Sequence, residues 1–296
     1  MSDEALPFTG ERFTPECVRE IWYEHWHRYA FARPLAAGKR VLDVACGEGY
    51  GSALLSDVAA EVVGLDIDPD SIAHASSRYA AHRNLRYQQA DATALPFADA
   101  SFDLIVSFET LEHLTAQEQL LAGFARVLTD DGLLVISSPD KRTYSELAGF
   151  RNEFHVRELY REELLDLLKP HFPEVRLYGQ KLLFQSAVWS LDADPTRCET
   201  ATASRQGETV AAGLGYTPMY FIAACAKRAL PAGLPDLSLF GDDAESVYAH
   251  YNHEIRKNIS AGARIAELEA ELGRLQARAA PAAAERRDWR WWRRNR

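Results

Sequence analysis

The 296-residue chain has few of the residues that would indicate a disulfide, a metal cluster or a membrane segment. Its four cysteines, Cys17, Cys46, Cys198 and Cys225, have neither a metal-type spacing nor a pairing pattern. No run approaches the roughly 18 consecutive apolar residues that a membrane span needs. The N-terminus "MSDEALPFTGERF" is acidic and lacks the apolar core of a secretory signal. These absences predict a reduced, cytoplasmic protein.

Positive charge is also scarce, because 33 lysines and arginines face 43 acidic residues and the net charge is −10. The chain therefore lacks the basic footprint of a nucleic-acid-binding protein. The last sixteen residues, "PAAAERRDWRWWRRNR", are different, with six arginines and three tryptophans. Aromatic residues interleaved with arginines suit an anionic membrane surface, so residues 286–296 are a candidate for peripheral contact with the inner membrane. A disordered, solubilising end is the alternative.

Strand and helix patterns alternate from Lys39 onward, which predicts an α/β fold with a mostly parallel sheet and helices on both faces. The predicted strands are residues 40–45, 61–67, 85–91, 102–108, 133–139, 174–179 and 219–227. The first predicted helix runs from the glycine turn to about Asp57, and the second begins at Pro69 after its cap, Asp68. Two more lie within residues 115–132 and 160–172, with Gly132 beyond the end of one and Pro170 stopping the other. Residues 179–217 interrupt this alternation, and a loop longer than about 15 residues is often a functional lid.

The sequence becomes strongly helical from residue 242 to residue 280. Ile265, Leu268, Leu272 and Leu275 follow the 3-4-3 spacing of a short coiled-coil seam, which can form a homodimer. A helix packed on its own domain is the alternative. We therefore expect an N-terminal helical cap over residues 1–38, a central domain over 39–228 in which 179–217 is a candidate substrate lid, and a C-terminal helical extension over 229–296.

The stretch "VLDVACGEGYGS", residues 41–52, joins the first predicted strand to a helix through a glycine-rich turn. A nucleoside triphosphate site would need a lysine after the last glycine, and none follows Gly51. A dinucleotide site would need the spacing G-x-G-x-x-G, whereas Gly47, Gly49 and Gly51 come at alternate positions. A ligand approaches such a turn closely because glycine has no Cβ.

Three acidic residues follow successive strands and narrow the choice of ligand. Asp43 lies within the first strand, where a carboxylate beside a pyrophosphate would be repelled but one beside an ammonium group would be stabilised; fastening the glycine turn is the alternative. Asp66 ends the second strand and can accept hydrogen bonds from a ribose. Asp91 follows the third strand and suits the amino group of adenine. Together the three acids describe S-adenosylmethionine.

The run from about Arg40 to Lys227 resembles the class I S-adenosylmethionine-dependent methyltransferases of the type 11 group. The motifs that carry the resemblance are "VLDVACGEGYGS", "VVGLDIDPDSI", "ADATALPFADASFDLIVSFETLEHL" and "LTDDGLLVISSPD". The resemblance implies a Rossmann-like sheet of seven strands with the last antiparallel. It also implies that the cofactor is held at its methionine, ribose, adenine and sulfonium parts by Asp43, Ala45, Gly47, Gly49, Asp66, Ile67, Asp91, Ala92 and Phe108.

Proton transfer would be needed if the acceptor of the methyl group is a hydroxyl, and histidine is the usual base near neutral pH. His113 and His155 follow the fourth and fifth strands and are the first candidates; structural roles are the alternative for each. His25 and His27 come third. Arg12 and Arg28 are candidates for the cofactor carboxylate. We expect no metal, because no carboxylate–histidine group has clear ligand spacing.

The N-terminal segments "FTGERFTPE" and "EHWHRYAFA" are similar to a leader of methyltransferases in bacterial surface-polysaccharide and glycolipid pathways. "NEFHVRELYREEL" resembles a segment of the same proteins. The expected function is therefore O-methylation of a sugar hydroxyl in a polysaccharide or glycolipid precursor. Methylation of a small molecule, such as a natural product or a quinone, is the first alternative. A non-catalytic scaffold is the second, and a nicotinamide oxidoreductase ranks last.

Overall fold

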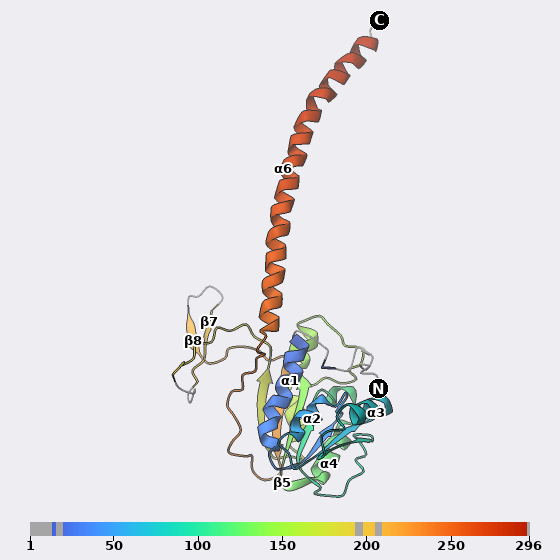
Figure 1. Ribbon diagram of the computed structural model, residues 1–296, viewed down its shortest axis with the longest axis vertical. Helices are drawn as coiled ribbons and strands as arrows, with labels where there is room; N and C mark the ends of the chain where they lie inside the picture. The colour runs from blue at the N-terminus through green and yellow to red at the C-terminus, as the bar shows by residue number, and fades with distance from the viewer. Residues whose placement is uncertain (1–13, 16–19, 193–197, 205–208, 295–296) are drawn as a thin grey trace. The chain divides into compact units, whose positions relative to one another are not determined.

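The computed structural model describes residues 14–15, 20–192, 198–204 and 209–294, and side chains as far as residue 277 in the last helix. The chain divides into two units, Met1–Phe240 and Gly241–Arg296. The first unit contains the sheet and the second is almost entirely one helix (Figure 1). The predicted cap residues 1–13, including Arg12, lie outside the described residues.

Seven strands form the central sheet in the order β3-β2-β1-β4-β5-β9-β6. Neighbouring strands are parallel except at β9, which runs antiparallel between β5 and β6. This topology confirms the predicted Rossmann-like sheet with its last strand antiparallel. The strands are β1 (Arg40–Val44), β2 (Glu61–Asp66), β3 (Leu85–Gln89), β4 (Phe102–Ser107), β5 (Leu128–Pro139), β6 (Glu174–Gln180) and β9 (Tyr220–Ala226).

Helices cover both faces of this sheet, because alternate strand residues point to opposite sides. Leu42 and Ile105 pack in the core cluster with α4 and α5, whereas the adjacent Val41 and Leu104 pack with α1, η1 and α2. The helices of this unit are α1 (Glu20–Ala32), η1 (Arg33–Ala36), α2 (Tyr50–Ser56), α3 (Pro69–Arg78), η2 (Leu111–His113), α4 (Gln117–Val127), η3 (Arg142–Glu146) and α5 (Arg161–Leu168). Asp68 caps α3, since its carboxylate accepts from the backbone amides of Asp70 and Ser71.

Two regions differ from the sequence expectation. The helix expected over residues 115–132 ends at Val127, and Leu128 already begins β5. Leu128 is fully buried in β5, and a core-facing helix would also bury a leucine at this position. The apolar pattern alone therefore could not place the boundary between helix and strand. The expected loop over residues 179–217 contains a two-stranded antiparallel sheet, β7 (Ala201–Ala203) and β8 (Val210–Ala212).

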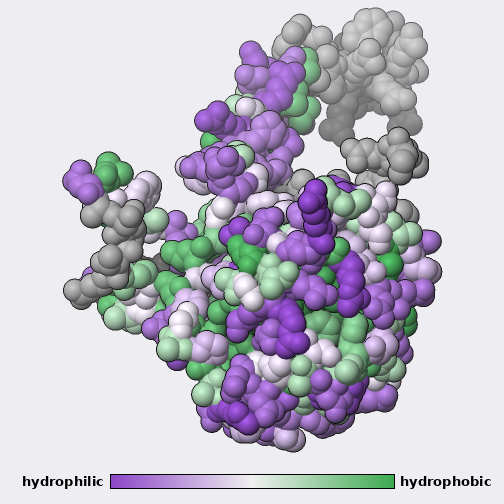
Figure 2. Space-filling model, turned by 60° about the horizontal axis from the view of Figure 1, so that its bottom comes forward, coloured by the Kyte–Doolittle hydropathy of each residue, from purple (hydrophilic) through white to green (hydrophobic). Residues whose placement is uncertain are grey.

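The C-terminal unit contains α6 (Ser246–Arg294). Its four predicted seam residues, Ile265, Leu268, Leu272 and Leu275, are between 47% and 55% exposed. The coiled-coil dimer therefore stays a prediction, as does membrane contact through residues 286–296, whose side chains lie outside the described set. Among the helices that the structure describes, none has both the length and the apolar composition of a bilayer-spanning segment. Hydrophilic and hydrophobic residues are interspersed over the surface in Figure 2.

Candidate functional site

The glycine turn leaves β1 at the carboxyl edge of the parallel strands, where ligands bind in open α/β sheets. Ala45, Gly47 and Gly49 have positive φ angles of 59°, 54° and 95°. A Cβ on Gly49 would lie 2.7 Å from the Ala75 Cβ and 2.8 Å from the Tyr87 hydroxyl. This position therefore requires glycine both for its backbone angle and for its packing.

Asp66 fastens this turn to the next strand. Its carboxylate accepts from the backbone amide of Gly47 at 2.8 Å and from that of Asp68 at 3.0 Å. The side chain of the following residue, Ile67, is 67% exposed and presents an apolar surface beside the turn. Fastening the glycine turn was the alternative role considered for Asp43, and Asp66 is the residue that makes this contact. The Asp66 carboxylate still has lone pairs that can accept hydrogen bonds from a ligand.

Asp43 is buried beneath the turn and binds hydroxyl groups. Its carboxylate accepts from the Ser52 hydroxyl at 2.6 Å and from the Tyr29 hydroxyl at 3.1 Å. Burial raises the pKa of Asp43 to about 7, although the hydrogen bonds from Ser52 and Tyr29 oppose the shift. Asp43 therefore joins α1 and α2 to β1, and its protonation changes near neutral pH.

Asp91 lies one strand further along the same edge. Asp66 and Gln89 are paired in register between β2 and β3, so the segment after β3 begins beside Asp66. The Asp91 carboxylate accepts from the backbone amide and the hydroxyl of Thr93, which lowers its pKa. Ala92 packs against the core between them. The structure thus brings the predicted ribose and adenine residues to neighbouring strand ends.

Arg28 reaches the same edge from α1 and is 1% exposed. Its Nε donates to Gln180 Oε1 at 2.9 Å, and its guanidinium lies 4.5 Å from the centre of the Tyr220 ring. Nη2 is 3.5 Å from Glu109 Oε1, yet neither Nη1 nor Nη2 has a hydrogen-bond partner among the described residues. A buried guanidinium with two unsatisfied nitrogens suits a carboxylate ligand.

Phe108 follows β4 directly and packs in the core cluster beside Tyr29, and its contact with the cofactor stays a prediction. It is 8% exposed, and its ring meets the Tyr29 ring edge-on at 5.0 Å between centroids. Tyr29 is one of the residues that sequence reasoning missed. It occurs in the aromatic-rich α1 segment, where the local sequence pattern does not distinguish a tyrosine that donates a hydrogen bond to Asp43 from an ordinary core residue.

His113 and His155 are 42 positions apart in the sequence, but their rings lie edge to face with centroids 5.0 Å apart. The Nδ1 of His113 is 3.1 Å from the Phe154 carbonyl, and the Nδ1 of His155 is 2.6 Å from Glu158 Oε1. The Tyr144 ring stacks on His155 at 5.3 Å. The two predicted bases are therefore neighbours in one site, and their assignment as bases stays a prediction.

Glu112, between this pair and the sheet, was also missed. Its side chain is fully buried, and neither carboxylate oxygen accepts a hydrogen bond from the described residues. Burial first, and then the nearby Glu109 carboxylate, raise the pKa of Glu112 above its usual range. Its position beside His113 in "FETLEHL" was the available signal, but a glutamate in a short helix is usually exposed.

His25 and His27 belong to α1 and have a different environment. Burial and the neighbouring Arg28 charge lower both pKa values, that of His27 to about 4. The Nε2 of His27 is 3.0 Å from the Ser238 hydroxyl. Both histidines are therefore neutral at physiological pH. The structure does not place them in the His113–His155 pair.

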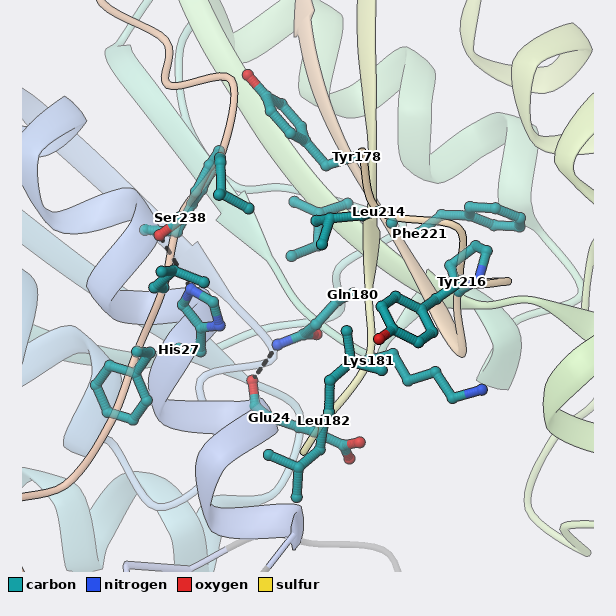
Figure 3. A pocket seen from close by; sticks show the side chains of 18 of the residues that line it. Glu24, His27, Tyr178, Gln180, Lys181, Leu182, Leu214, Tyr216, Phe221 and Ser238 are labelled. Atoms are coloured by element: carbon teal, nitrogen blue, oxygen red, sulfur yellow. Dashed lines mark hydrogen bonds between the residues drawn. The ribbon is translucent and has the colours of Figure 1, made fainter. Parts of the chain in front are cut away.

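A cavity of about 690 Å³ opens beside the carboxyl end of β6. Aromatic rings and polar groups share its lining, including Tyr23, Glu24, His27, Tyr178, Lys181 and Tyr216 (Figure 3). Gln180 connects the cavity to the strand-end site, because it accepts from Arg28 while its Nε2 donates to the Glu24 carbonyl at 2.9 Å. The cavity and the strand-end site therefore share a wall.

Known proteins resemble this chain in both sequence and fold. Residues 42–136 match the family described as "Methyltransferase domain". A Mycolicibacterium smegmatis protein named "Probable S-adenosylmethionine-dependent methyltransferase" is 39% identical over 168 residues, which are 56% of this chain and 64% of that protein. The Aspergillus sclerotiorum "O-methyltransferase resE" is 32% identical over 177 residues, or 57% of this chain and 62% of that protein. The chain thus spans less than two thirds of these relatives.

The crystal structure of the YcgJ protein from Bacillus subtilis matches with a TM-score of 0.50 and 22% identity, covering 69% of this chain and all of that one. The match to the methyltransferase family and to the Mycolicibacterium smegmatis relative implies S-adenosylmethionine as the cofactor. The residues here fit it. The Gly49 turn admits a close ligand, Asp66 and exposed Ile67 suit ribose and adenine, and the two unsatisfied nitrogens of Arg28 suit the carboxylate.

Proposed function

We propose that this chain, whose residues 42–136 form a methyltransferase domain, methylates a sugar hydroxyl of a polysaccharide or glycolipid precursor in the cytoplasm. The observation that carries the methyl-transfer part is the left-handed turn from Ala45 to Gly49, fastened by Asp66 at the carboxyl edge of the sheet. A scaffold protein would need neither the strained turn nor the two buried Arg28 nitrogens that have no hydrogen-bond partner among the described residues.

When bound, the cofactor supplies a methyl group already activated on a sulfonium. The protein has to align the acceptor oxygen with that methyl, and orientation alone can contribute several kcal/mol to lowering the barrier. Arg28 would bind the carboxylate of the cofactor and Asp66 its ribose, while the apolar ring of Phe108 would exclude water near the sulfonium. As the carbon–oxygen bond forms and the carbon–sulfur bond breaks, the hydroxyl proton must leave. His113 and His155 are the candidate acceptors of that proton.

The cavity beside β6 supports a sugar-bearing acceptor. Tyr178 and Tyr216 line the cavity, and tyrosine rings can pack on the apolar faces of sugar rings, while Glu24 and Lys181 can form hydrogen bonds with hydroxyls (Figure 3). The roots of the 179–217 insertion form part of this lining, which is consistent with the proposed substrate lid. The name of the Aspergillus relative supports oxygen as the atom methylated.

The experiment that tests this proposal is transfer of labelled methyl from S-adenosylmethionine into a lysate of the native host. The products are separated into glycolipid, polysaccharide, protein and small-molecule fractions. Label in the glycolipid or polysaccharide fraction is expected. Label only among small molecules would replace the sugar acceptor with a natural product or quinone, and no label despite cofactor binding would favour a scaffold. The control is the Asp66→Asn variant, which should transfer less label at limiting cofactor.

Asp66→Asn should weaken cofactor binding by about 10- to 100-fold, since a hydrogen bond to a charged group contributes roughly 1.5–3 kcal/mol. The new amide nitrogen would also face the backbone donors of Gly47 and Asp68, which now bind the two carboxylate oxygens. Titration calorimetry with S-adenosylmethionine measures the change. The matched control is Asp70→Asn, an exposed position in the first turn of α3. Equal affinities of the two variants would contradict the role of Asp66.

A further inference from the structure

We propose that Glu112, His113 and His155 form a binding site for a divalent transition-metal ion of the Zn²⁺ or Mn²⁺ type. Each residue offers one ligand atom, and these atoms lie within 4.8 Å of one another. Imidazole nitrogen and carboxylate oxygen are the ligands that such ions accept, at about 2.0–2.2 Å for zinc. The site goes beyond the proposed methyl transfer, and ion binding can occur without it, but a bound ion would use the two histidines that are the candidate bases.

Hydrogen bonds on the far side of both rings direct the metal-binding nitrogens inward. Glu158 Oε1 and the Phe154 carbonyl can only accept, so the Nδ1 atoms of His155 and His113 both carry hydrogen. Each Nε2 atom then has the lone pair that a metal needs. A carboxylate behind a ligating histidine is the usual support of a metal site, because it fixes the ring and raises the basicity of the ligand.

Asn152 confirms this tautomer of His155. The backbone amide of Phe154 donates to Asn152 Oδ1 at 3.0 Å, which fixes the orientation of the side-chain amide. Its Nδ2 therefore faces His155 Nε2, at 2.9 Å, and donates to the lone pair there. A metal ion would take the place of this donor, so Asn152 occupies the ligand position in the absence of metal.

Charge around the cluster favours a cation. A fully buried carboxylate without a hydrogen bond, as at Glu112, is costly to maintain. Two more carboxylates lie near it: Glu109, which Arg28 and Ser137 engage, and Glu158, which His155 engages. The Nε2 of His113 approaches Glu112 Oε1 at 3.9 Å, too far for a hydrogen bond. An ion between them would satisfy the orphaned oxygens directly.

The backbone holds the two ligand segments together. Glu112 and His113 lie in η2, and the backbone amides of Val156 and Arg157 donate to the Glu112 carbonyl at 2.8 and 3.0 Å. His155 is thereby held beside η2 before any metal binds, and an ion has to displace only the Asn152 amide from its Nε2 atom. Three protein ligands leave a coordination position for water or an acceptor hydroxyl. A bound ion would lower the pKa of that hydroxyl, and because both Nε2 atoms would then be ligands, its proton would pass to a water molecule and not to His113 or His155.

Zinc binding to the full-length, untagged protein carrying Cys198→Ser tests the site, because Cys198 is the exposed cysteine of the described residues. After removal of metal with a chelator, titration calorimetry should show one Zn²⁺ per chain. Glu112→Gln and His155→Gln should each weaken binding by at least about 100-fold, and Glu158→Gln by about 10- to 100-fold. Cobalt should give visible ligand-field bands that these variants lose.

The matched control is His171→Gln, which removes the histidine of a separate His–Glu pair with 3.0 Å between His171 Nε2 and Glu118 Oε2. It should bind zinc like the parent. Circular dichroism of each metal-free variant establishes that it is folded, and Glu112→Gln keeps the size of the buried side chain. No zinc binding by the parent, or equal binding by Glu112→Gln and His171→Gln, would overturn the proposal. Neither readout uses S-adenosylmethionine, so the outcome is independent of methyl transfer.

Discussion

Gly51→Ala should lower the free energy of unfolding by about 3 kcal/mol, at the upper end of what overpacking costs. A Cβ on Gly51 would lie only 2.0 Å from Cζ of the Tyr29 ring. That ring is buried and cannot move aside easily, because it packs on Tyr50 and Phe108 and its hydroxyl binds Asp43. We therefore expect both a loss of stability and a displaced α1.

Urea unfolding measures the effect, and Gly123→Ala is the matched control within a helix of the same unit. A Cβ on Gly123 meets no atom closer than 3.7 Å, at Leu95 Cδ1. Alanine should stabilise α4 there by roughly 0.5–1 kcal/mol through helix propensity. If Gly51→Ala were as stable as the parent, the Tyr29 ring of α1 could not lie against Gly51 of α2 as closely as described.

Asp43→Asn should make the protein more stable at pH 8 and a poorer binder of the cofactor. Burial raises the pKa of Asp43 from 3.8 to about 7 in the folded protein. The folded state therefore retains a proton that the unfolded chain has released. The stabilisation is complete below about pH 4 and is lost as the pH rises to 7. Above pH 7 the parent keeps a buried carboxylate, which costs up to about 4 kcal/mol at 1.36 kcal/mol per pH unit.

Asparagine has nearly the same shape and no charge, so its contribution should not change with pH. Between pH 4 and 7 the free energy of unfolding of the variant should fall less steeply than that of the parent, by about 1.4 kcal/mol per pH unit. Urea titrations at pH 5, 6, 7 and 8 give both profiles. Asp130→Asn, at an exposed ion pair with Arg228, serves as the control. If the free energies of unfolding of Asp43→Asn and the parent changed equally with pH, the raised pKa of Asp43 would be contradicted.

Cofactor affinity should change in the opposite direction. If the cofactor ammonium lies beside Asp43, binding favours the carboxylate, and the affinity of the parent should rise with pH until about 7. Asp43→Asn should bind about 10- to 100-fold more weakly at pH 8, the loss expected for a charged hydrogen bond. A variant that gained stability but kept full affinity would leave Asp43 as a residue that only fastens α1 and α2.

The sequence predicted the sheet and the edge of the site because both depend on local patterns. The run from Val41 to Ser52 combines a buried strand, a glycine turn and a helix start, and each has its own signal. The boundary at Leu128 was wrong because a buried leucine satisfies a helix and a strand equally. The contacts of Asp43 with Tyr29, and of Glu112 with the loop around His155, join segments that no sequence spacing relates.

For His113 and His155, the sequence predicted the residues but not their arrangement. Each was identified because it follows a strand at the ligand-binding edge, and topology brings such residues together. Their distance, the carboxylate behind His155 and the orphaned Glu112 depend on how residues 152–158 fold back on η2. Metal-ligand spacing rules describe ligands on one short segment, so they could not detect a cluster divided between two segments.

Helix α1 lies before the first residue of the family match but packs in the core of the same unit. The matched domain begins at residue 42, yet Tyr29, Phe31, Ala32 and Ala36 are buried in the same core cluster as β1 and β4. A chain beginning at Lys39 would uncover the part of this face on which α1 and η1 pack and leave the Asp43 carboxylate without the Tyr29 hydroxyl. The matched segment is thus shorter than the packed core, and hydrogen exchange should protect the amides of α1 together with those of β1.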